Sequence, residues 1–198
     1  MKHEESTFLA WITRMSLIQR WALMHTFQTE NISEHSHQVA VIAHLLAVIK
    51  NKRYDGNLIP ERAATVAIYH EVSETLVQDI NHKTKYSNPE ITKAVKALED
   101  LAEKKCLNTL PDDLQDEFES LLVQEKVEPE YKAIVKAADI LQAYIKTMNE
   151  LRFHNEEFHH VKDGLGERIS ELAKTMPEVQ DFLNIFMGSC TTTLDKIA

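Results

Sequence analysis

Glycine, proline and cysteine are all scarce in this sequence. Four of its 198 residues are glycine, five are proline and two are cysteine. A fold built from many short strands needs frequent turn residues, so this scarcity argues against an all-β protein and favours long helices. Cys106 and Cys190 lie far apart and outside any CxxC pattern, which predicts neither a disulfide framework nor a zinc ribbon. A reducing compartment, the cytoplasm, is therefore expected.

Long hydrophobic runs and a basic excess are also missing. The most apolar stretch, residues 39–49, is interrupted by His44 and is too short to span a bilayer. The polar segment 1–5 lacks the apolar region of a signal peptide, so no membrane partner is expected. The formal net charge of −9 argues against a nucleic-acid polymer as partner. A small anion remains possible, because one metal ion and one arginine can outweigh the global charge locally.

The remaining pattern is that of a helical globular protein. The apolar fraction of 43% and the charged fraction of 27% are ordinary values. The length predicts a single domain over residues 1–198. Hydrophobic periodicity predicts an all-α bundle of seven or eight helices, with residues 73–79 ambiguous and 80–88 a loop. The expected helices cover about residues 6–16, 33–52, 60–72, 89–105, 111–125, 128–153, 156–174 and 177–194.

Four polar residues stand in or beside apolar runs where a bare polar group would be costly to bury. His70 and Glu71 end the run from Ala63 to Tyr69, and Asp139 interrupts an apolar helix. His35 lies in the first turn of the expected helix 33–52. Two imidazoles and two carboxylates are a plausible ligand set for a divalent cation that supports hydrolysis.

Each of these residues also has an ordinary structural explanation when it is taken alone. His35 can face solvent, and Asp139 can form a buried ion pair with a lysine or an arginine. Glu71 and Glu74 can be acidic residues of a helix surface. Glu74 also shares a helix face with His70, four residues before it, where a carboxylate could serve as a general base.

Arg20 and Trp21 follow an apolar pair and resemble an anion clamp beside an aromatic wall. The alternative is a surface arginine beside a packed tryptophan.

Four segments of the chain, in order and spacing, resemble the HD-domain phosphohydrolases and, within them, the bacterial 5′-deoxynucleotidase family. These segments are Leu17–Met24, Glu30–Ser36, Tyr69–Glu74 and Val135–Tyr144. The similarity extends from about residue 6 to residue 153 and more weakly beyond. It implies a helical HD-domain fold, one divalent metal ion (Co, Mn, Zn, Fe or Mg), and hydrolysis of deoxyribonucleoside 5′-monophosphates by a homodimer.

The resemblance also implies a role for each matched residue. The metal ligands would be His35, His70, Glu71 and Asp139. Glu74 would act as general acid or base, and Arg20 would orient the phosphate. Trp21 would pack against the sugar and reject a 2′-hydroxyl, while Asp79 would bind the 3′-hydroxyl.

Two departures from the family pattern bear on these roles. The family's His-Asp pair is His70-Glu71 here, which adds one methylene at a ligand position. The loop that usually contains Gly-Asp-Leu-Pro-Thr-Pro-Val-Lys-Tyr is replaced by residues 78–86, which keep Asp79 but lose the prolines. His82, new in this loop, could contact phosphate or metal, or could face solvent. The departures leave open a catalytically degenerate homologue that binds a nucleotide as a sensor or regulator.

Overall fold

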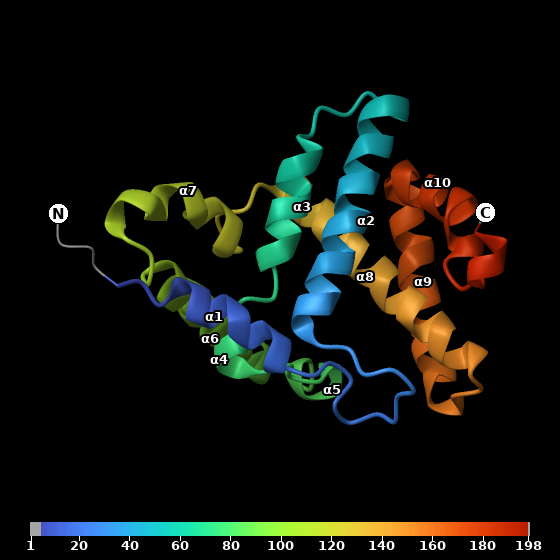
Figure 1. The fold of residues 1–198 in the computed structure, drawn as a ribbon, viewed down its shortest axis with the longest axis horizontal. Helices are drawn as coiled ribbons and strands as arrows, with labels where there is room; N and C mark the ends of the chain where they lie inside the picture. Colours follow the sequence, from blue (N-terminus) through green and yellow to red (C-terminus); the bar gives the residue numbers. More distant parts are fainter. Residues whose placement is uncertain (1–4, 198) are drawn as a thin grey trace.

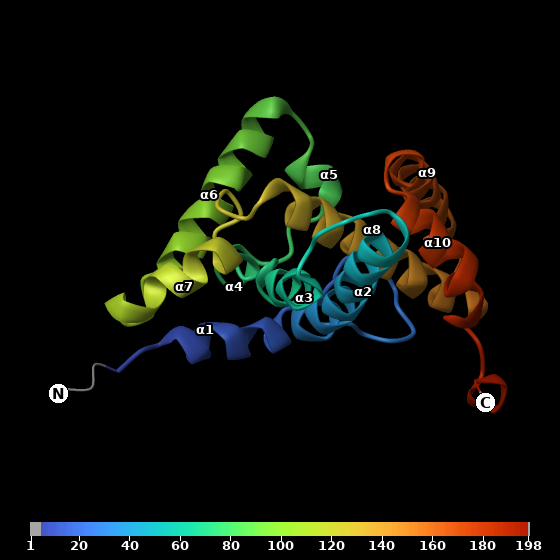
Figure 2. The ribbon, with the colours of Figure 1, turned by 90° about the horizontal axis from the view of Figure 1, so that it is seen from above.

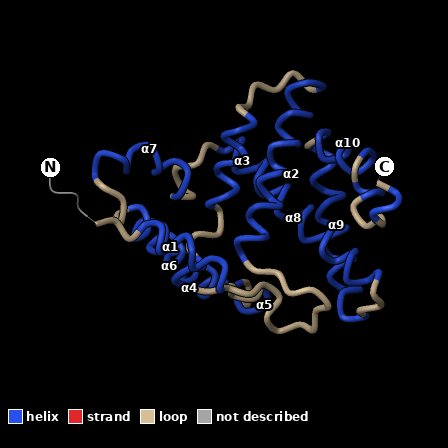
Figure 3. Tube along the Cα trace, viewed as in Figure 1, coloured by secondary structure: helices blue, strands red, loops and turns tan. Residues whose placement is uncertain are grey.

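The computed structural model describes residues 5–197, and within that range helices connected by loops make up the fold (Figure 3). No strand occurs among these residues, apart from an isolated antiparallel bridge between Gln19 and Asn31. This confirms the all-α prediction. None of the helices between residues 5 and 197 has the length and hydrophobicity that crossing a membrane requires.

Most of the helices agree with the expected pattern, although the helix that begins at Pro60 ends at Tyr69 rather than near residue 72. Residues 5–197 contain α1 (Phe8–Arg14), α2 (Ile32–Arg53), α3 (Pro60–Tyr69), α4 (Glu74–Val77), α5 (His82–Lys85), α6 (Pro89–Leu107), α7 (Asp112–Leu122), α8 (Pro129–Arg152), α9 (His159–Thr175) and α10 (Pro177–Ile185).

The expected loop over residues 80–88 was wrong, because it contains the single turn α5, where the Asn81 side chain accepts a hydrogen bond from the Thr84 N–H. The last helix ends at Ile185 rather than near residue 194, ahead of Gly188 and the threonines at 191–193.

The helix boundaries follow from local chemistry. Asn31 caps α2 in a reciprocal pair with Glu34, so that the side chain of each accepts a hydrogen bond from the backbone N–H of the other. Pro60 begins α3 at the position where a missing N–H costs nothing, and α6, α8 and α10 also begin with proline. The Asn31–Glu34 pair fixes where α2 begins, and with it the position of His35.

The larger hydrophobic core surrounds α2, which packs against α3, α8 and α10 (Figure 1). Val39, Ala43, Leu46 and Ala47 of α2 are completely buried. Because buried positions occur on several sides of α2, this helix lies near the centre of the core, as its dense apolar sequence predicts.

A smaller core joins α1, the segment after α3, α6 and α7 at the other end of the molecule (Figure 2). Phe8 stacks edge-on against Phe118 with ring centroids 5.4 Å apart, and Val72 and Cys106 are completely buried beside them. The turn from His70 to Ser73 runs from the larger core to the smaller one. Polar residues of this turn therefore lie where the two cores meet.

The loop between residues 18 and 31 is held against the end of α8 by one buried carboxylate. Glu150, with 2% of its surface exposed, accepts hydrogen bonds from the backbone N–H groups of Phe27 (2.9 Å) and Gln28 (3.3 Å). It also pairs with the buried ammonium of Lys146. Burial acts to raise the pKa of Glu150, but these hydrogen bonds outweigh it and lower the pKa.

We expect Glu150→Ala to lower the free energy of unfolding by about 3–5 kcal/mol, because it leaves the Lys146 ammonium buried without its negatively charged partner. The control Glu156→Ala removes an exposed carboxylate and should change stability by less than about 0.5 kcal/mol. Urea denaturation measures both. Because the pKa of Glu150 is lower in the folded state, the difference from wild type should be full above about pH 5 and shrink as the pH falls through that pKa. Equal losses in the two variants would contradict the assigned role.

Candidate metal centre

Three separate parts of the chain bring His35, His70, Glu71 and Asp139 together, and we call these residues the ligand cluster. Each offers one nitrogen or oxygen atom, and these atoms all lie within 4.8 Å of one another. The Nε2 atom of His35 is 3.4 Å from Oδ1 of Asp139, and Nε2 of His70 is 3.4 Å from Oε1 of Glu71. Residues over a hundred positions apart therefore form one compact polar site inside an apolar helical fold.

The end of α3 explains how two adjacent residues reach the same site. Neighbouring side chains of a regular helix diverge by about 100°. Here α3 ends at Tyr69, and His70 and Glu71 belong to the turn that follows it. Leaving the helix frees Glu71 to turn its longer carboxylate towards the ring of His70.

Each imidazole has one ring nitrogen without a hydrogen-bond partner in the described part of the chain. The Nδ1 atom of His70 donates a hydrogen bond to the carbonyl oxygen of Ala67 at 2.7 Å, which leaves its Nε2 lone pair free. Within residues 5–197, the buried Nε2 atoms of His35 and His70 find no hydrogen-bond partner. Burial lowers the pKa of His70 and favours the neutral ring that metal binding requires. These orphaned nitrogens fit a divalent cation.

The two carboxylates of the ligand cluster are held in their charged form. Burial acts to raise the pKa of Asp139, but the surrounding groups, among them the Lys136 ammonium, hold it well below the ordinary value. Lys136 Nζ lies 2.6 Å from Asp139 Oδ2, while Oδ1 faces His35. Burial also acts to raise the pKa of Glu71, but His70, His35 and Arg20 together act against burial and lower this pKa. Asp139 is thus paired with a lysine, as the simple structural explanation expects, but it also lies in the cluster.

Glu74 lies beside the cluster and differs from it in protonation. Burial and the charges of Glu71 and Asp79 raise the pKa of Glu74 to about 10. Its buried Oε2 has no hydrogen-bond partner among residues 5–197. A carboxyl group that holds its proton beside a candidate metal site is typical of acid–base catalysts.

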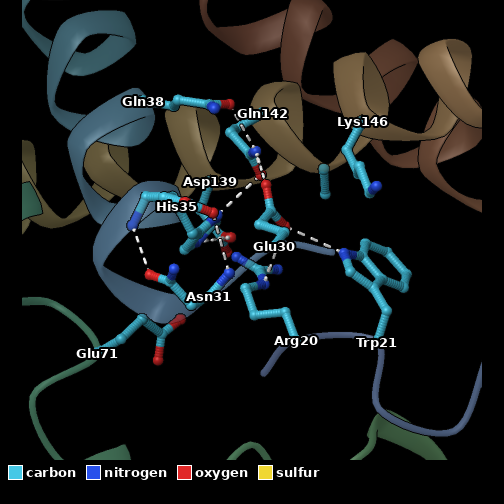
Figure 4. A network of polar contacts seen from close by, with 12 residues as sticks. Arg20, Trp21, Glu30, Asn31, His35, Gln38, Glu71, Asp139, Gln142 and Lys146 are labelled. Atoms are coloured by element: carbon cyan, nitrogen blue, oxygen red, sulfur yellow. Dashed lines mark hydrogen bonds and ion pairs between the residues drawn. The ribbon is translucent and has the colours of Figure 1, made fainter. Parts of the chain in front are cut away.

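Arg20 and Trp21 lie beside the ligand cluster, where both interact with Glu30 (Figure 4). Arg20 Nε is 3.6 Å from Glu30 Oε2, and the indole Nε1 of Trp21 donates to the same oxygen at 3.1 Å. Trp21 also packs against Phe158 with ring centroids 5.4 Å apart. The Arg20 Nη1 atom is buried without a hydrogen-bond partner in the described chain, which leaves it free for an anion.

Two residues of this region have unusual backbone conformations. Trp21 has a φ angle of 59°, and Gln78, just before Asp79, has a φ of 62° and a ψ of 173°. Residues other than glycine rarely adopt such values, which cost about 1–3 kcal/mol each and are concentrated at functional sites. The family that the sequence resembles usually has glycine at this position, and glycine adopts such values without strain.

Asp79 and His82 have different relations to the site. Burial raises the pKa of Asp79 although Arg20 and the backbone of Trp21 act against it, which places this carboxyl group near both residues. His82 is exposed on α5, where its ring stacks on Tyr86 with centroids 4.5 Å apart, and it is not part of the ligand cluster. The solvent-facing alternative therefore describes His82 in this structure.

A polar pocket of about 240 Å³ opens beside the cluster. Its walls combine three cluster residues with lysines from α5 and α8 and with acidic residues of α6. The lining residues are His70, Glu71, Ser73, Lys85, Glu99, Glu103, Gln124, Lys132, Val135, Lys136 and Asp139.

The sequence did not single out three residues that the structure places around the cluster. Gln142 and Glu30 lie in the polar network behind His35, and Lys136 pairs with Asp139. A signal existed for two of them, because Lys136 and Gln142 stand three residues before and after Asp139 and share its helix face. Glu30 had no such signal, since its partners come from α8 and from the loop around Arg20 and Trp21.

Comparison with known proteins places this geometry in a family. A family model described as 5′-deoxynucleotidase YfbR-like matches residues 7–190. A protein named 5′-deoxynucleotidase from Vibrio cholerae is 46% identical over 195 residues, which cover 98% of this chain and 100% of that protein. Its counterpart from Photobacterium profundum is 45% identical with the same coverage.

The fold is similar to that of a solved structure. An HD-domain phosphohydrolase from Listeria innocua superposes with a TM-score of 0.81 at 19% identity, over 95% of this chain and 90% of that one. The family match spans the whole ligand cluster together with Arg20, Glu74 and Asp79. The chain belongs to the YfbR-like 5′-deoxynucleotidase family.

Proposed function

We propose that this protein is a metal-dependent phosphomonoesterase that converts deoxyribonucleoside 5′-monophosphates to deoxynucleoside and phosphate. The observation that carries the proposal is a set of polar atoms without hydrogen-bond partners in and around the ligand cluster. Two imidazole nitrogens face two ionised carboxylates, with the free guanidinium nitrogen of Arg20 and the protonated Glu74 alongside. The names of the family and of the Vibrio cholerae relative support the choice of substrate.

In this proposal His35, His70, Glu71 and Asp139 hold one divalent cation. Two imidazoles and two carboxylates suit zinc, manganese, cobalt or iron, and the donor set alone does not select among them. When bound, the cation offsets the phosphate charge and acts as a Lewis acid.

The protein's own groups would perform the remaining steps. Arg20 binds a phosphate oxygen, because its buried Nη1 has a donor to spare. A water molecule attacks phosphorus, the bond from phosphorus to the 5′-oxygen breaks, and the deoxynucleoside leaves with a 5′-hydroxyl. Glu74 would give its proton to the leaving 5′-oxygen and take up the proton that the attacking water releases, a role worth roughly 10²–10⁴ in rate.

The sugar would be recognised by the residues beside Arg20. Trp21 is fixed by its bond to Glu30 and by Phe158, so its indole can form a rigid wall that leaves no room for a 2′-oxygen. Asp79, near the backbone of Trp21, would bind the 3′-hydroxyl. His82 is exposed close to Lys85 and would contact substrate only at the edge of the site.

We also propose that the chain acts as one domain, in the cytoplasm and as a homodimer. Cys106 and Cys190 are both free thiols, which suits a reducing compartment. An apolar groove of about 500 Å³ lies between η1 (Met15–Leu17), α2 and α3, where Val41 and Ile68 are exposed. Apolar surface of this kind is typical of contacts between subunits.

Asp139→Ala should abolish metal binding, whereas Glu74→Gln should abolish turnover and leave metal binding intact. The first change removes a ligand and the second removes only a proton carrier. Metal analysis of the purified variants and phosphate release from a panel of deoxynucleotides measure the two effects. Loss of metal in Glu74→Gln would make Glu74 a ligand. Wild-type protein that binds manganese but releases no phosphate would favour the nucleotide-sensing alternative.

Glu71→Asp restores the side chain usual in the family, yet we expect it to lower metal affinity and phosphatase rate together. The turn after α3 already brings the longer Glu71 carboxylate within 3.4 Å of His70, so a shorter one should fall short of the cation. Cobalt titration and kcat measure the effect. An increase in both cobalt affinity and kcat would show instead that Glu71 holds the metal less well than an aspartate would.

Val41→Glu should convert a dimer into a monomer, because it places a charge in the apolar groove. Light scattering should give twice the chain mass of 22.8 kDa for wild type and the single mass for the variant. The control Leu9→Glu changes another exposed apolar residue outside the groove and should stay dimeric. A monomeric wild type would refute the dimer, and a dimeric Val41→Glu would place its interface elsewhere.

A further inference from the structure

The most informative unassigned feature is a chain of buried hydrogen bonds behind the ligand cluster, which we call the Gln142 chain. It connects His35, Gln142, Glu30 and Trp21 (Figure 4). His35 is completely buried, and Gln142 and Glu30 are 1% and 6% exposed. A buried amide between a candidate metal ligand and a carboxylate is costly to bury unless its hydrogen bonds are all satisfied.

The partners of Gln142 determine how its amide is oriented. Its Nε2 atom faces the Oε1 atom of Glu30 and lies 2.9 Å from Oε1 of Gln38. The Glu30 carboxylate can only accept hydrogen bonds, so the amide nitrogen must point towards it. The amide oxygen of Gln142 then faces the other way, 2.8 Å from Nδ1 of His35.

This orientation settles which nitrogen of His35 carries the proton. An amide oxygen accepts and does not donate, so Nδ1 of His35 must be the donor. The lone pair is therefore on Nε2, the atom that faces Asp139 at 3.4 Å. Hydrogen bonds of this kind from a ligand's second ring nitrogen fix its tautomer and ring orientation in metal sites.

The other end of the Gln142 chain reaches the groups proposed to bind substrate. The Oε1 atom of Glu30 accepts a hydrogen bond from the amide nitrogen of Gln142. The Oε2 atom of Glu30 accepts the indole N–H of Trp21 at 3.1 Å and lies 3.6 Å from Arg20 Nε. The backbone carbonyl of Glu30 accepts the N–H of Arg20 at 2.9 Å. One carboxylate thus fixes Gln142, Trp21 and Arg20 at once.

We propose that Gln142 is a positioning residue that presents His35 Nε2 to the metal and connects it, through Glu30, to Trp21 and Arg20. The proposal rests on the proposed function, because it takes His35 as a ligand. It adds that the metal site and the sugar and phosphate contacts are held by one chain of hydrogen bonds. Damage at either end should therefore be measurable at the other.

Two single variants break the chain at different links. Gln142→Met keeps the length of the side chain but removes its donor and acceptor, and should weaken Co²⁺ affinity by about 10–100-fold. Glu30→Gln leaves one acceptor oxygen for two donors, Gln142 Nε2 and Trp21 Nε1, so one bond is lost. It should raise the KM for deoxynucleotide and narrow the deoxyribo-to-ribo ratio of kcat/KM.

The exchange Gln142→Glu with Glu30→Gln provides a sharper test, because it preserves net charge and can restore the links between His35 and Trp21. Gln38, which accepts from Gln142 in the wild type, would turn its amide to donate to the new carboxylate. A carboxylate at position 142 accepts from His35 Nδ1 and from the new amide at position 30. That amide keeps an oxygen for the Trp21 N–H. We expect the double variant to recover Co²⁺ affinity and the substrate ratio to within about threefold of wild type, well above Glu30→Gln alone.

The control Thr147→Val removes another buried hydrogen bond of α8, from Thr147 Oγ1 to the Ala143 carbonyl oxygen at 2.8 Å. It should lower thermal stability but leave Co²⁺ affinity unchanged. Unchanged affinity in Gln142→Met, together with loss in Asp139→Ala, would overturn the role of Gln142 and leave the metal centre standing. Unchanged affinity in Asp139→Ala would refute the metal centre itself. If Gln142→Met does not fold, an exchange variant no better than Glu30→Gln overturns the proposal.

Discussion

The burial of unlike polar groups at one point between two hydrophobic cores is the constraint on which this structure depends. Asp139 and Glu71 bring negative charge into the fold, and His35 and His70 bring nitrogens that no other described residue satisfies. An apolar helix would exclude each of these groups singly. Together these groups satisfy one another only in part, and the two free nitrogen lone pairs beside two negative charges fit a cation. The start of α2, the end of α3 and the middle of α8 lie where they bring these four residues together.

Arg20 and Trp21 show how a loop can be as well defined as the helices. Glu150 holds the backbone of the loop at residues 27 and 28, and Glu30 holds the side chains at its other end. Both carboxylates are buried and both bind residues distant in sequence. A rigid wall and a fixed guanidinium are what a site needs if it is to discriminate between similar sugars by shape.

Much of this organisation was predictable from the sequence, because periodicity and capping are local. The sequence predicted a helix from about residue 33, close to the observed start of α2 at Ile32, and the polar interruption at Asp139 marked the site. The role of Glu30 was not predictable, since its partner Gln142 meets it only after α8 packs against α2. The end of α3 at Tyr69 was also missed, although it lets His70 and Glu71 face one point.

The identity of the metal ligands is the central claim, and X-ray absorption of the cobalt-loaded wild-type protein tests it most directly. The account predicts a first shell of nitrogen and oxygen at about 2.0–2.2 Å, with the outer-shell scattering of two imidazole rings. Protein that binds cobalt without imidazole scattering, or with sulfur in the first shell, would contradict the assignment of His35 and His70.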